Sequence, residues 1–203
     1  THPKVAKLTF TGSTAVGKML AGKAAGNMKR VSCELGGHAP FLVLKDADPV
    51  HAAKGLQLVK FLNTGQACIS PNRIFVHRDI LAAFLDTLTG RVADMKAGNG
   101  MEQGVTIGPL VNEAAVAKVE NPVRDAVEKG AKILCGGERL TAGDLGRGHF
   151  YAPTVLTDVT PEMLIYREET FGPVAAVVPF DDGDDVLAMA NDTHYGLAAY
   201  VYS

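Results

Sequence analysis

Two short motifs in this sequence place a reactive side chain beside glycines. Glu34 begins Glu-Leu-Gly-Gly, and Cys68 ends Asn-Thr-Gly-Gln-Ala-Cys. Glycine lets a backbone approach a substrate closely, a cysteine thiolate is a nucleophile, and a carboxylate can act as a general base. The two motifs therefore suggest a nucleophilic Cys68 with Glu34 as a separate base.

Simpler interpretations of both residues stay open. A cysteine is most often a buried, inert thiol, and Glu34 could be a surface residue in a turn. Cys68, however, follows a polar loop that contains glycine instead of lying on an apolar stripe. An ordinary thiol, with a pKa near ~8.5, is only slightly ionised at neutral pH, so a reactive Cys68 needs backbone dipoles, a cofactor's positive charge or a base. Cys33 and Cys135 lie in apolar strand patterns and are expected in the core.

A third motif, at residues 12–18, fits the pattern GxxxxGK of nucleotide-binding P-loops. That loop needs a serine or threonine next, to hold Mg²⁺, and the next residue is Met19. What remains is a strand, a Gly12-Ser13 turn and a helix N-terminus whose free N–H groups suit an anion such as a dinucleotide pyrophosphate. An ordinary glycine turn explains the pattern equally well, and a P-loop-like nucleotide hydrolase is a distant alternative.

Alternating strand and helix patterns surround these motifs. Asp48-Pro49 is a typical helix start, with aspartate as N-cap and proline at the first position, and this helix leads into the Cys68 loop. The alternation predicts an α/β fold in which helices flank a mostly parallel sheet. Strands are expected at residues 5–10, 41–44, 73–77, 131–135, 150–156, 174–180 and 197–202, and helices at 14–25, 48–62, 79–95, 112–129 and 184–191.

Composition and charge exclude several classes of protein. Of the 203 residues 47% are hydrophobic and 21% charged, and the net charge is −2 without a basic block, so no nucleic-acid or membrane surface is expected. The three cysteines and six histidines lack the spacing of metal ligands or of a disulfide framework, so no metal site is expected. The cysteine pattern suits a reducing compartment and no signal peptide is visible, so we expect a cytoplasmic protein.

Four motifs, taken in order, resemble the aldehyde dehydrogenase superfamily over the whole chain. They are residues 10–13 (Phe-Thr-Gly-Ser), 34–37 (Glu-Leu-Gly-Gly), 65–68 (Gly-Gln-Ala-Cys) and 169–173 (Glu-Thr-Phe-Gly-Pro). Within the superfamily, residues 39–41, 72–73, 104–110 and 191–193 are most similar to the succinate-semialdehyde dehydrogenase branch.

The resemblance implies an NAD(P)-dependent oxidation of an aldehyde to a carboxylic acid. Cys68 would attack the aldehyde carbon, its backbone N–H would be one oxyanion donor, and loss of hydride from the thiohemiacetal would leave a thioester. Glu34 would activate the water that hydrolyses this thioester; a positioned base typically contributes ~10²–10⁴-fold.

The same resemblance assigns the cofactor, NAD or NADP, to residues of two regions. Gly12 and Ser13 would lie at the pyrophosphate, with Gly17 and Leu35 also among the cofactor-binding residues. Glu169 and Phe171 would hold the nicotinamide ribose and ring. The parent protein is expected to be a homo-oligomer, a dimer or a tetramer, as family members often are.

Two positions depart from the branch. Leu62 stands where the branch usually carries an arginine that binds the substrate carboxylate, and losing one partner of a buried charge pair costs about 2–5 kcal/mol. An uncharged aldehyde is therefore the alternative to a semialdehyde such as succinate semialdehyde. Ser70 stands where some relatives carry a second cysteine, so their redox switch is expected to be absent.

The ends of the chain suggest a fragment of a longer protein. It begins without methionine and stops in residues typical of a strand that has just begun. By comparison with the family, residues 1–33 are expected to be the C-terminal remnant of the NAD(P)-binding domain. Residues 34–203 are expected to form the catalytic, thiol-bearing domain, truncated at its C-terminal end, and the isolated fragment is expected to be inactive.

Overall fold

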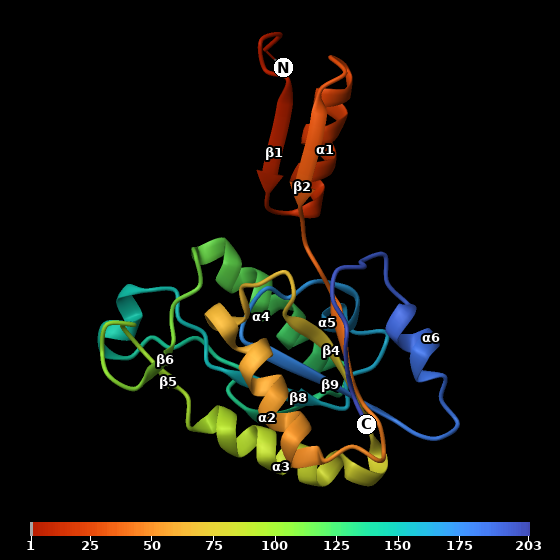
Figure 1. The fold of residues 1–203 in the computed structure, drawn as a ribbon. Helices are drawn as coiled ribbons and strands as arrows, with labels where there is room; N and C mark the ends of the chain where they lie inside the picture. Colours follow the sequence, from red (N-terminus) through yellow and green to blue (C-terminus); the bar gives the residue numbers. More distant parts are fainter. Residues whose placement is uncertain (1) are drawn as a thin grey trace. The chain divides into compact units, whose positions relative to one another are not determined.

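The computed structural model describes residues 2–203, so Thr1, the first residue of the predicted 1–33 segment, lies outside the described residues. The chain forms two compact units, of which the first ends at Gly37 and the second spans His38–Ser203 (Figure 1). Whether these units correspond to a cofactor-domain remnant and a catalytic domain stays a prediction.

The first unit is a strand–helix–strand motif. Strand β1 (Lys7–Thr11) pairs in parallel with β2 (Arg30–Glu34), and helix α1 (Thr14–Ala25) connects them. Ser13 caps α1, since its side chain accepts a hydrogen bond from the backbone N–H of Val16 at 3.4 Å.

The second unit is built on a six-stranded sheet with the strand order β10-β3-β4-β9-β8-β7. All neighbouring strands are parallel except the pair β7 and β8, so the predicted α/β fold with a mostly parallel sheet is confirmed. The strands are β3 (Ala39–Val43), β4 (Pro71–His77), β7 (Lys132–Cys135), β8 (Thr154–Thr157), β9 (Val174–Phe180) and β10 (Tyr200–Tyr202). The helices are α2 (Pro49–Lys60), α3 (Arg78–Ala93), α4 (Glu113–Glu128), α5 (Leu164–Arg167) and α6 (Val186–Asn191), with short turns η1 (Leu62–Gly65) and η2 (Gly143–Arg147).

Helices cover both faces of this sheet. Every residue of β4 is buried, including the polar Asn72, Arg73 and His77, and β9 is an apolar run throughout, as expected of a strand that is covered on both faces. One face packs against α2 and α3 through Phe41, Ile74, Val177, Leu56, Phe84 and Leu88. The other face packs against α4 and α5 through Leu42, Phe75, Val178, Val119, Val123 and Ile165. The sheet is thus covered on both faces, and the loops lie at the two ends of its strands.

The structure corrects several element boundaries. The helix expected to reach Leu62 ends at Lys60, because Asn63 and Thr64 have left-handed backbones with φ of 49° and 59°. The strand expected over residues 150–156 begins only at Thr154. Cys33 and Cys135 are half-buried, not core residues.

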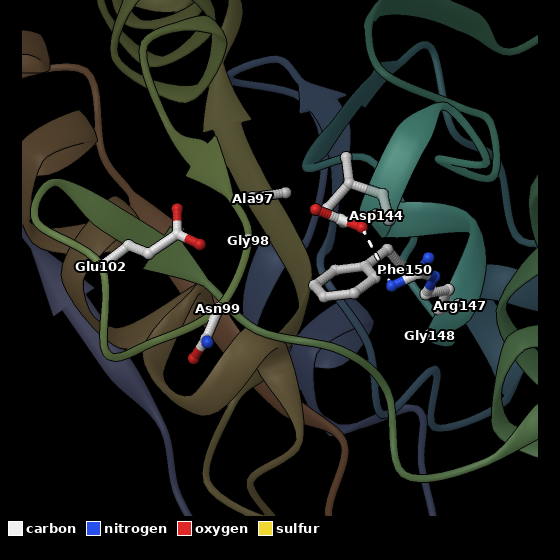
Figure 2. A pocket seen from close by; sticks show the side chains of 9 residues that line it. Ala97, Gly98, Asn99, Glu102, Asp144, Arg147, Gly148 and Phe150 are labelled. Atoms are coloured by element: carbon white, nitrogen blue, oxygen red, sulfur yellow. Dashed lines mark ion pairs between the residues drawn. The ribbon is translucent and has the colours of Figure 1, made fainter.

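A two-stranded sheet of β5 (Lys96–Ala97) and β6 (Val105–Ile107) has no counterpart in the predicted elements. It borders an open hollow of about 410 Å³ shared with η2 (Figure 2). Asp144 and Arg147 form an ion pair of 3.4 Å beside it, and both side chains are largely exposed. The hollow is lined by Ala97, Gly98, Asn99, Glu102, Asp144, Leu145, Arg147, Gly148 and Phe150. It contains none of the predicted site residues.

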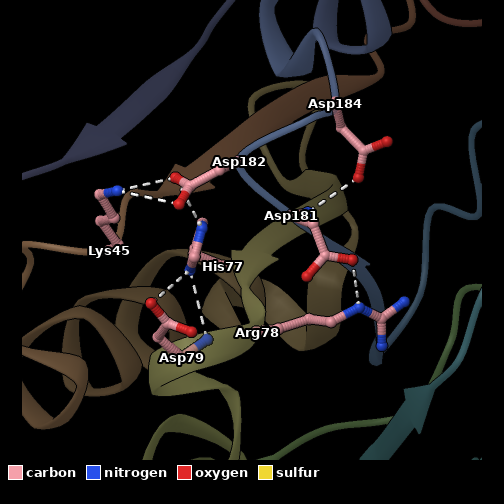
Figure 3. A network of polar contacts seen from close by, with 7 residues as sticks. All are labelled: Lys45, His77, Arg78, Asp79, Asp181, Asp182 and Asp184. Carbon is pink, nitrogen blue, oxygen red and sulfur yellow. Dashed lines mark hydrogen bonds and ion pairs between the residues drawn. The ribbon is translucent and has the colours of Figure 1, made fainter.

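Charged pairs join the carboxyl ends of three neighbouring strands (Figure 3). Lys45, just past β3, binds Asp182 at 2.8 Å, and Nε2 of His77, at the end of β4, lies 3.3 Å from the same carboxylate. Arg78 donates to Asp181 at 2.7 Å. The two exposed pairs, Lys45–Asp182 and Arg78–Asp181, stabilise the fold by only about 0–1 kcal/mol each, whereas the His77 side chain is buried. They nevertheless hold the turns together at this edge, opposite the loops that precede β4 and β9.

Candidate active site

Cys68 lies in the loop between α2 and β4, at the amino edge of the large sheet, and it is half-buried. The loop begins with a left-handed turn in which Asn63, Thr64 and Gly65 all have positive φ. A β-branched threonine in this conformation costs on the order of 1–3 kcal/mol. Such strain persists only when surrounding contacts hold the residue in place.

Those contacts come from the segment after β6. The Thr64 hydroxyl donates to the carbonyl of Gly108 at 3.3 Å and accepts from the Gly108 N–H at 3.1 Å. The Gln66 side chain donates to the carbonyl of Pro109 at 3.3 Å and accepts from the Val111 N–H at 3.0 Å. The turn that leads to Cys68 is therefore fixed on both sides by hydrogen bonds.

The same turn lies directly against the segment that precedes β9. Gly65, with φ of 72°, approaches Gly172 so closely that a Cβ at Gly65 would lie 2.1 Å from the Gly172 carbonyl oxygen. Phe171, next to Gly172, also has a positive φ of 52°. The structure thus brings the Cys68 loop together with the segment that carries Glu169 and Phe171.

Lys118 of α4 reaches this second segment. Its ammonium lies 3.8 Å from the Glu169 carboxylate and 5.8 Å from the centroid of the Phe171 ring. The Glu169 side chain is only 12% exposed. A carboxylate that can accept hydrogen bonds and an aromatic ring that can pack against a planar group therefore both lie beside Lys118.

Two further residues adjoin the Cys68 loop. Lys60, the last residue of α2, is completely buried, and burial lowers its pKa to about 7, although attraction by Glu169 opposes the shift. The Tyr200 hydroxyl donates to the carbonyl of Ile69 at 3.0 Å. Burial raises the pKa of Tyr200, and the nearby Cys68 adds to the rise. Sequence reasoning missed both residues, and the only signal was a lysine in the last turn of the helix that leads to the Cys68 loop.

The first unit gathers the other predicted residues. Gly12 and Ser13 lie between β1 and α1, and the Gly12 N–H donates to the carbonyl of Glu34 at 3.0 Å. Leu35 packs on Gly17, where a Cβ would lie 2.4 Å from a Leu35 methyl group. The N-terminus of this twelve-residue helix is capped by Ser13, and a helix N-terminus attracts an anion through its N–H groups and its dipole. This arrangement fits the phosphates of a dinucleotide.

Glu34 is the last residue of β2 and is exposed. It belongs to the first unit and Cys68 to the second, so their action as base and nucleophile of one reaction stays a prediction. Among residues 2–203 there is no cluster of three or more side chains that could hold a metal ion. In the same part of the chain, no helix is both long and apolar enough to cross a membrane.

Comparisons with known proteins identify relatives over the whole chain. A family model described as "Aldehyde dehydrogenase family" matches residues 1–203. The chain is 49% identical over 202 residues to 3-sulfolactaldehyde dehydrogenase of Pseudomonas putida, covering 100% of this chain and 41% of the relative. It is 47% identical over 202 residues to the NADP⁺-dependent succinate-semialdehyde dehydrogenase of Escherichia coli K12, with the same two coverages of 100% and 41%.

A solved structure shows the same fold. The crystal structure of succinate-semialdehyde dehydrogenase from Burkholderia pseudomallei matches with a TM-score of 0.94 at 48% identity, over 100% of this chain and 41% of that one. The chain therefore spans about two fifths of the length of these relatives.

Proposed function

The chain belongs to the aldehyde dehydrogenase family, and from this premise we propose that Cys68 is the nucleophile of an NAD(P)-dependent aldehyde oxidation in the parent protein. The observation that carries the proposal is the strained turn at Asn63–Gly65. It is held by hydrogen bonds and lies against the segment of Glu169 and Phe171. A thiol on a fixed loop beside a dinucleotide-type surface suits covalent catalysis.

The proposed chemistry divides the oxidation into two steps. The Cys68 thiolate attacks the aldehyde carbon to give a thiohemiacetal, whose oxygen the Cys68 N–H stabilises. The bound NAD(P)⁺ supplies the acceptor for the hydride that leaves this carbon, and a thioester on Cys68 remains. Glu34 then takes a proton from water, the hydroxide oxygen bonds to the thioester carbon, and the C–S bond breaks to release the carboxylic acid.

The residues of each unit fit one part of the cofactor. We assign the pyrophosphate to Gly12, Ser13 and the α1 N-terminus, with Gly17 and Leu35 shaping that end. We assign the nicotinamide riboside to Glu169 and Phe171. The name of the Escherichia coli relative specifies NADP⁺, which favours NADP⁺ over NAD⁺ in the parent. The family resemblance also supports a homo-oligomeric parent.

For the substrate we propose a semialdehyde, with succinate semialdehyde as the first compound to test. Support comes from the motifs shared with the succinate-semialdehyde branch and from a relative named for that substrate. Leu62 favours the alternative of an uncharged aldehyde, because an apolar and 55% exposed side chain stands at the position of the expected arginine.

The decisive experiment replaces Cys68 by alanine in the full-length parent. NADPH or NADH formation is followed with a panel of charged and uncharged aldehydes and both cofactors. Cys68→Ala is expected to abolish turnover, whereas the control Cys135→Ser, which changes a half-buried cysteine of strand β7, is expected to keep it. Aldehyde oxidation that survives in Cys68→Ala would refute the proposed nucleophile.

A further inference from the structure

Lys60 is an unusual residue because its ammonium group is completely buried. Burying an unpaired cation is strongly unfavourable, so its surroundings must compensate. Its Nζ donates to Oδ1 of Asn72 at 3.1 Å. Lys60 is also the last residue of α2, and the carbonyls at the carboxyl end of a helix supply partial negative charge. Glu169 adds electrostatic attraction from the neighbouring segment.

The two hydrogen-bond partners of Lys60 follow Cys68 in the sequence. Its backbone carbonyl accepts a hydrogen bond from the Ser70 hydroxyl at 3.3 Å, and its ammonium binds Asn72. Ser70 and Asn72 are both buried. Residues 61–69, which include the left-handed turn and Cys68, therefore form a loop whose two ends meet at Lys60. Lys60 joins these ends through its main-chain carbonyl and its side-chain ammonium.

We propose that Lys60 is a positioning residue, which holds the Cys68 loop at its base through Asn72 and Ser70. The role rests on the proposed function of Cys68, but the geometry that supports it lies entirely among buried residues of the second unit. Lys60 itself has no exposed surface.

A purely structural lysine makes a different prediction. A buried polar or charged group that only fills space can often be replaced by an apolar side chain of similar volume with little loss of stability, or even a gain. A positioning lysine cannot, because methionine fills the volume but removes the ammonium that donates to Asn72 at the base of the loop. In Lys60→Met the reactivity of the Cys68 thiol should therefore change while the free energy of unfolding changes little.

The test measures alkylation of individual cysteines by iodoacetamide in the 203-residue chain, with peptide mapping by mass spectrometry. Lys60→Met is expected to change the rate constant at Cys68 at least fivefold, with Cys135 in the same unit changing less than twofold. The matched control is Lys54→Met, because Lys54 is an exposed residue of the same helix, and it should leave both rates unchanged. Ser70→Ala is a milder change, because it removes only the hydrogen bond to the Lys60 main-chain carbonyl. It is expected to change the alkylation rate constant of Cys68 in the same direction as Lys60→Met, but by a smaller factor.

Equal rates at Cys68 in Lys60→Met and wild type would overturn the proposal. Parallel changes at Cys68 and Cys135 would do the same, since they indicate general loosening of the unit. If Lys60→Met does not fold, Asn72→Leu decides, because it removes the side-chain partner of the ammonium, and an unchanged Cys68 rate there refutes the role. Alkylation needs no turnover, so failure of the parent to oxidise aldehydes would refute the proposed function without affecting this result.

Discussion

Replacement of Gly65 by alanine tests whether the Cys68 loop and the Glu169–Phe171 segment are held in direct contact. Gly65 has φ of 72°, and an added Cβ would lie 2.1 Å from the carbonyl oxygen of Gly172 and 3.1 Å from the nitrogen of Pro173. These are backbone atoms, so no rotation of a side chain can relieve the overlap. One of the two segments has to move.

The expected cost has two sources. Alanine in the left-handed region costs about 1–2 kcal/mol, and inserting a methyl group into a packed site costs about 1–3 kcal/mol. We therefore expect Gly65→Ala to lower the free energy of unfolding by about 2–5 kcal/mol. For a chain of this size each kcal/mol lowers Tm by about 2–4 °C, which gives a loss of roughly 4–20 °C.

Urea unfolding and thermal melting of the 203-residue chain measure this loss. The matched control is Gly90→Ala, since Gly90 lies in α3 with no atom within 4 Å of an added Cβ. Alanine there should stabilise the helix by up to about 1 kcal/mol. Alkylation of Cys68 should also change in Gly65→Ala alone. A Gly65→Ala chain within about 0.5 kcal/mol of wild type would show that the two segments are not in contact, and would refute the reasoning.

Three more predictions concern charge and specificity. Burial lowers the pKa of His38 from 6.5 to about 4, so between these pH values the unfolded chain binds more protons than the folded chain. The contribution of neutral His38 to the free energy of unfolding is therefore fully present above pH 6.5, and up to about 3 kcal/mol of it is lost as the pH drops to 4. Urea unfolding against pH measures this, and a His38→Gln chain with the same slope contradicts it. Arg73→Met should cost about 3 kcal/mol or more in urea, because Arg73 donates to the carbonyls of His38, Met189 and Ala190 in the interior; a loss below about 1 kcal/mol contradicts it. In the parent, Leu62→Arg should raise kcat/KM for succinate semialdehyde over an uncharged aldehyde by about tenfold or more; an unchanged ratio would exclude a carboxylate pocket at this residue.

The fold was predictable because most of its strands and helices have recognisable patterns in the local sequence. β9 is a buried apolar run and β4 has a buried apolar centre at residues 74–76, and Asp48 caps α2 as predicted, accepting from the N–H groups of Val50 and His51 at 2.8 and 3.1 Å. The strands β5 and β6 were not predictable, since they span only two and three residues and carry no apolar run of their own. Their position depends on packing against distant parts of the chain.

The candidate residues could be named from the sequence, but the contacts that support their loop could not. A glycine-flanked motif identified Cys68 and the family resemblance identified Glu169 and Phe171, and the structure brings the segments of these three residues together. Lys60 was not recognised, because a lysine near a helix C-terminus is usually a solvent-exposed residue that complements the helix dipole. Its burial follows from Asn72, which returns to it twelve positions later, and no local pattern reports such a contact.

The location of the Cys68 loop follows from strand pairing. Sites of parallel sheets usually lie at the carboxyl ends of the strands, but here charged pairs around His77 and Asp182 occupy those ends. Cys68 precedes β4 and Phe171 precedes β9, and these strands are parallel neighbours with Ile74 opposite Val177. Parallel neighbours bring the segments before them to the same edge, where Gly65 meets Gly172. A slip of one residue in this pairing would turn every side chain of β9 to the other face, so the two buried faces of the sheet also fix the Cys68 loop beside the segment of Glu169 and Phe171.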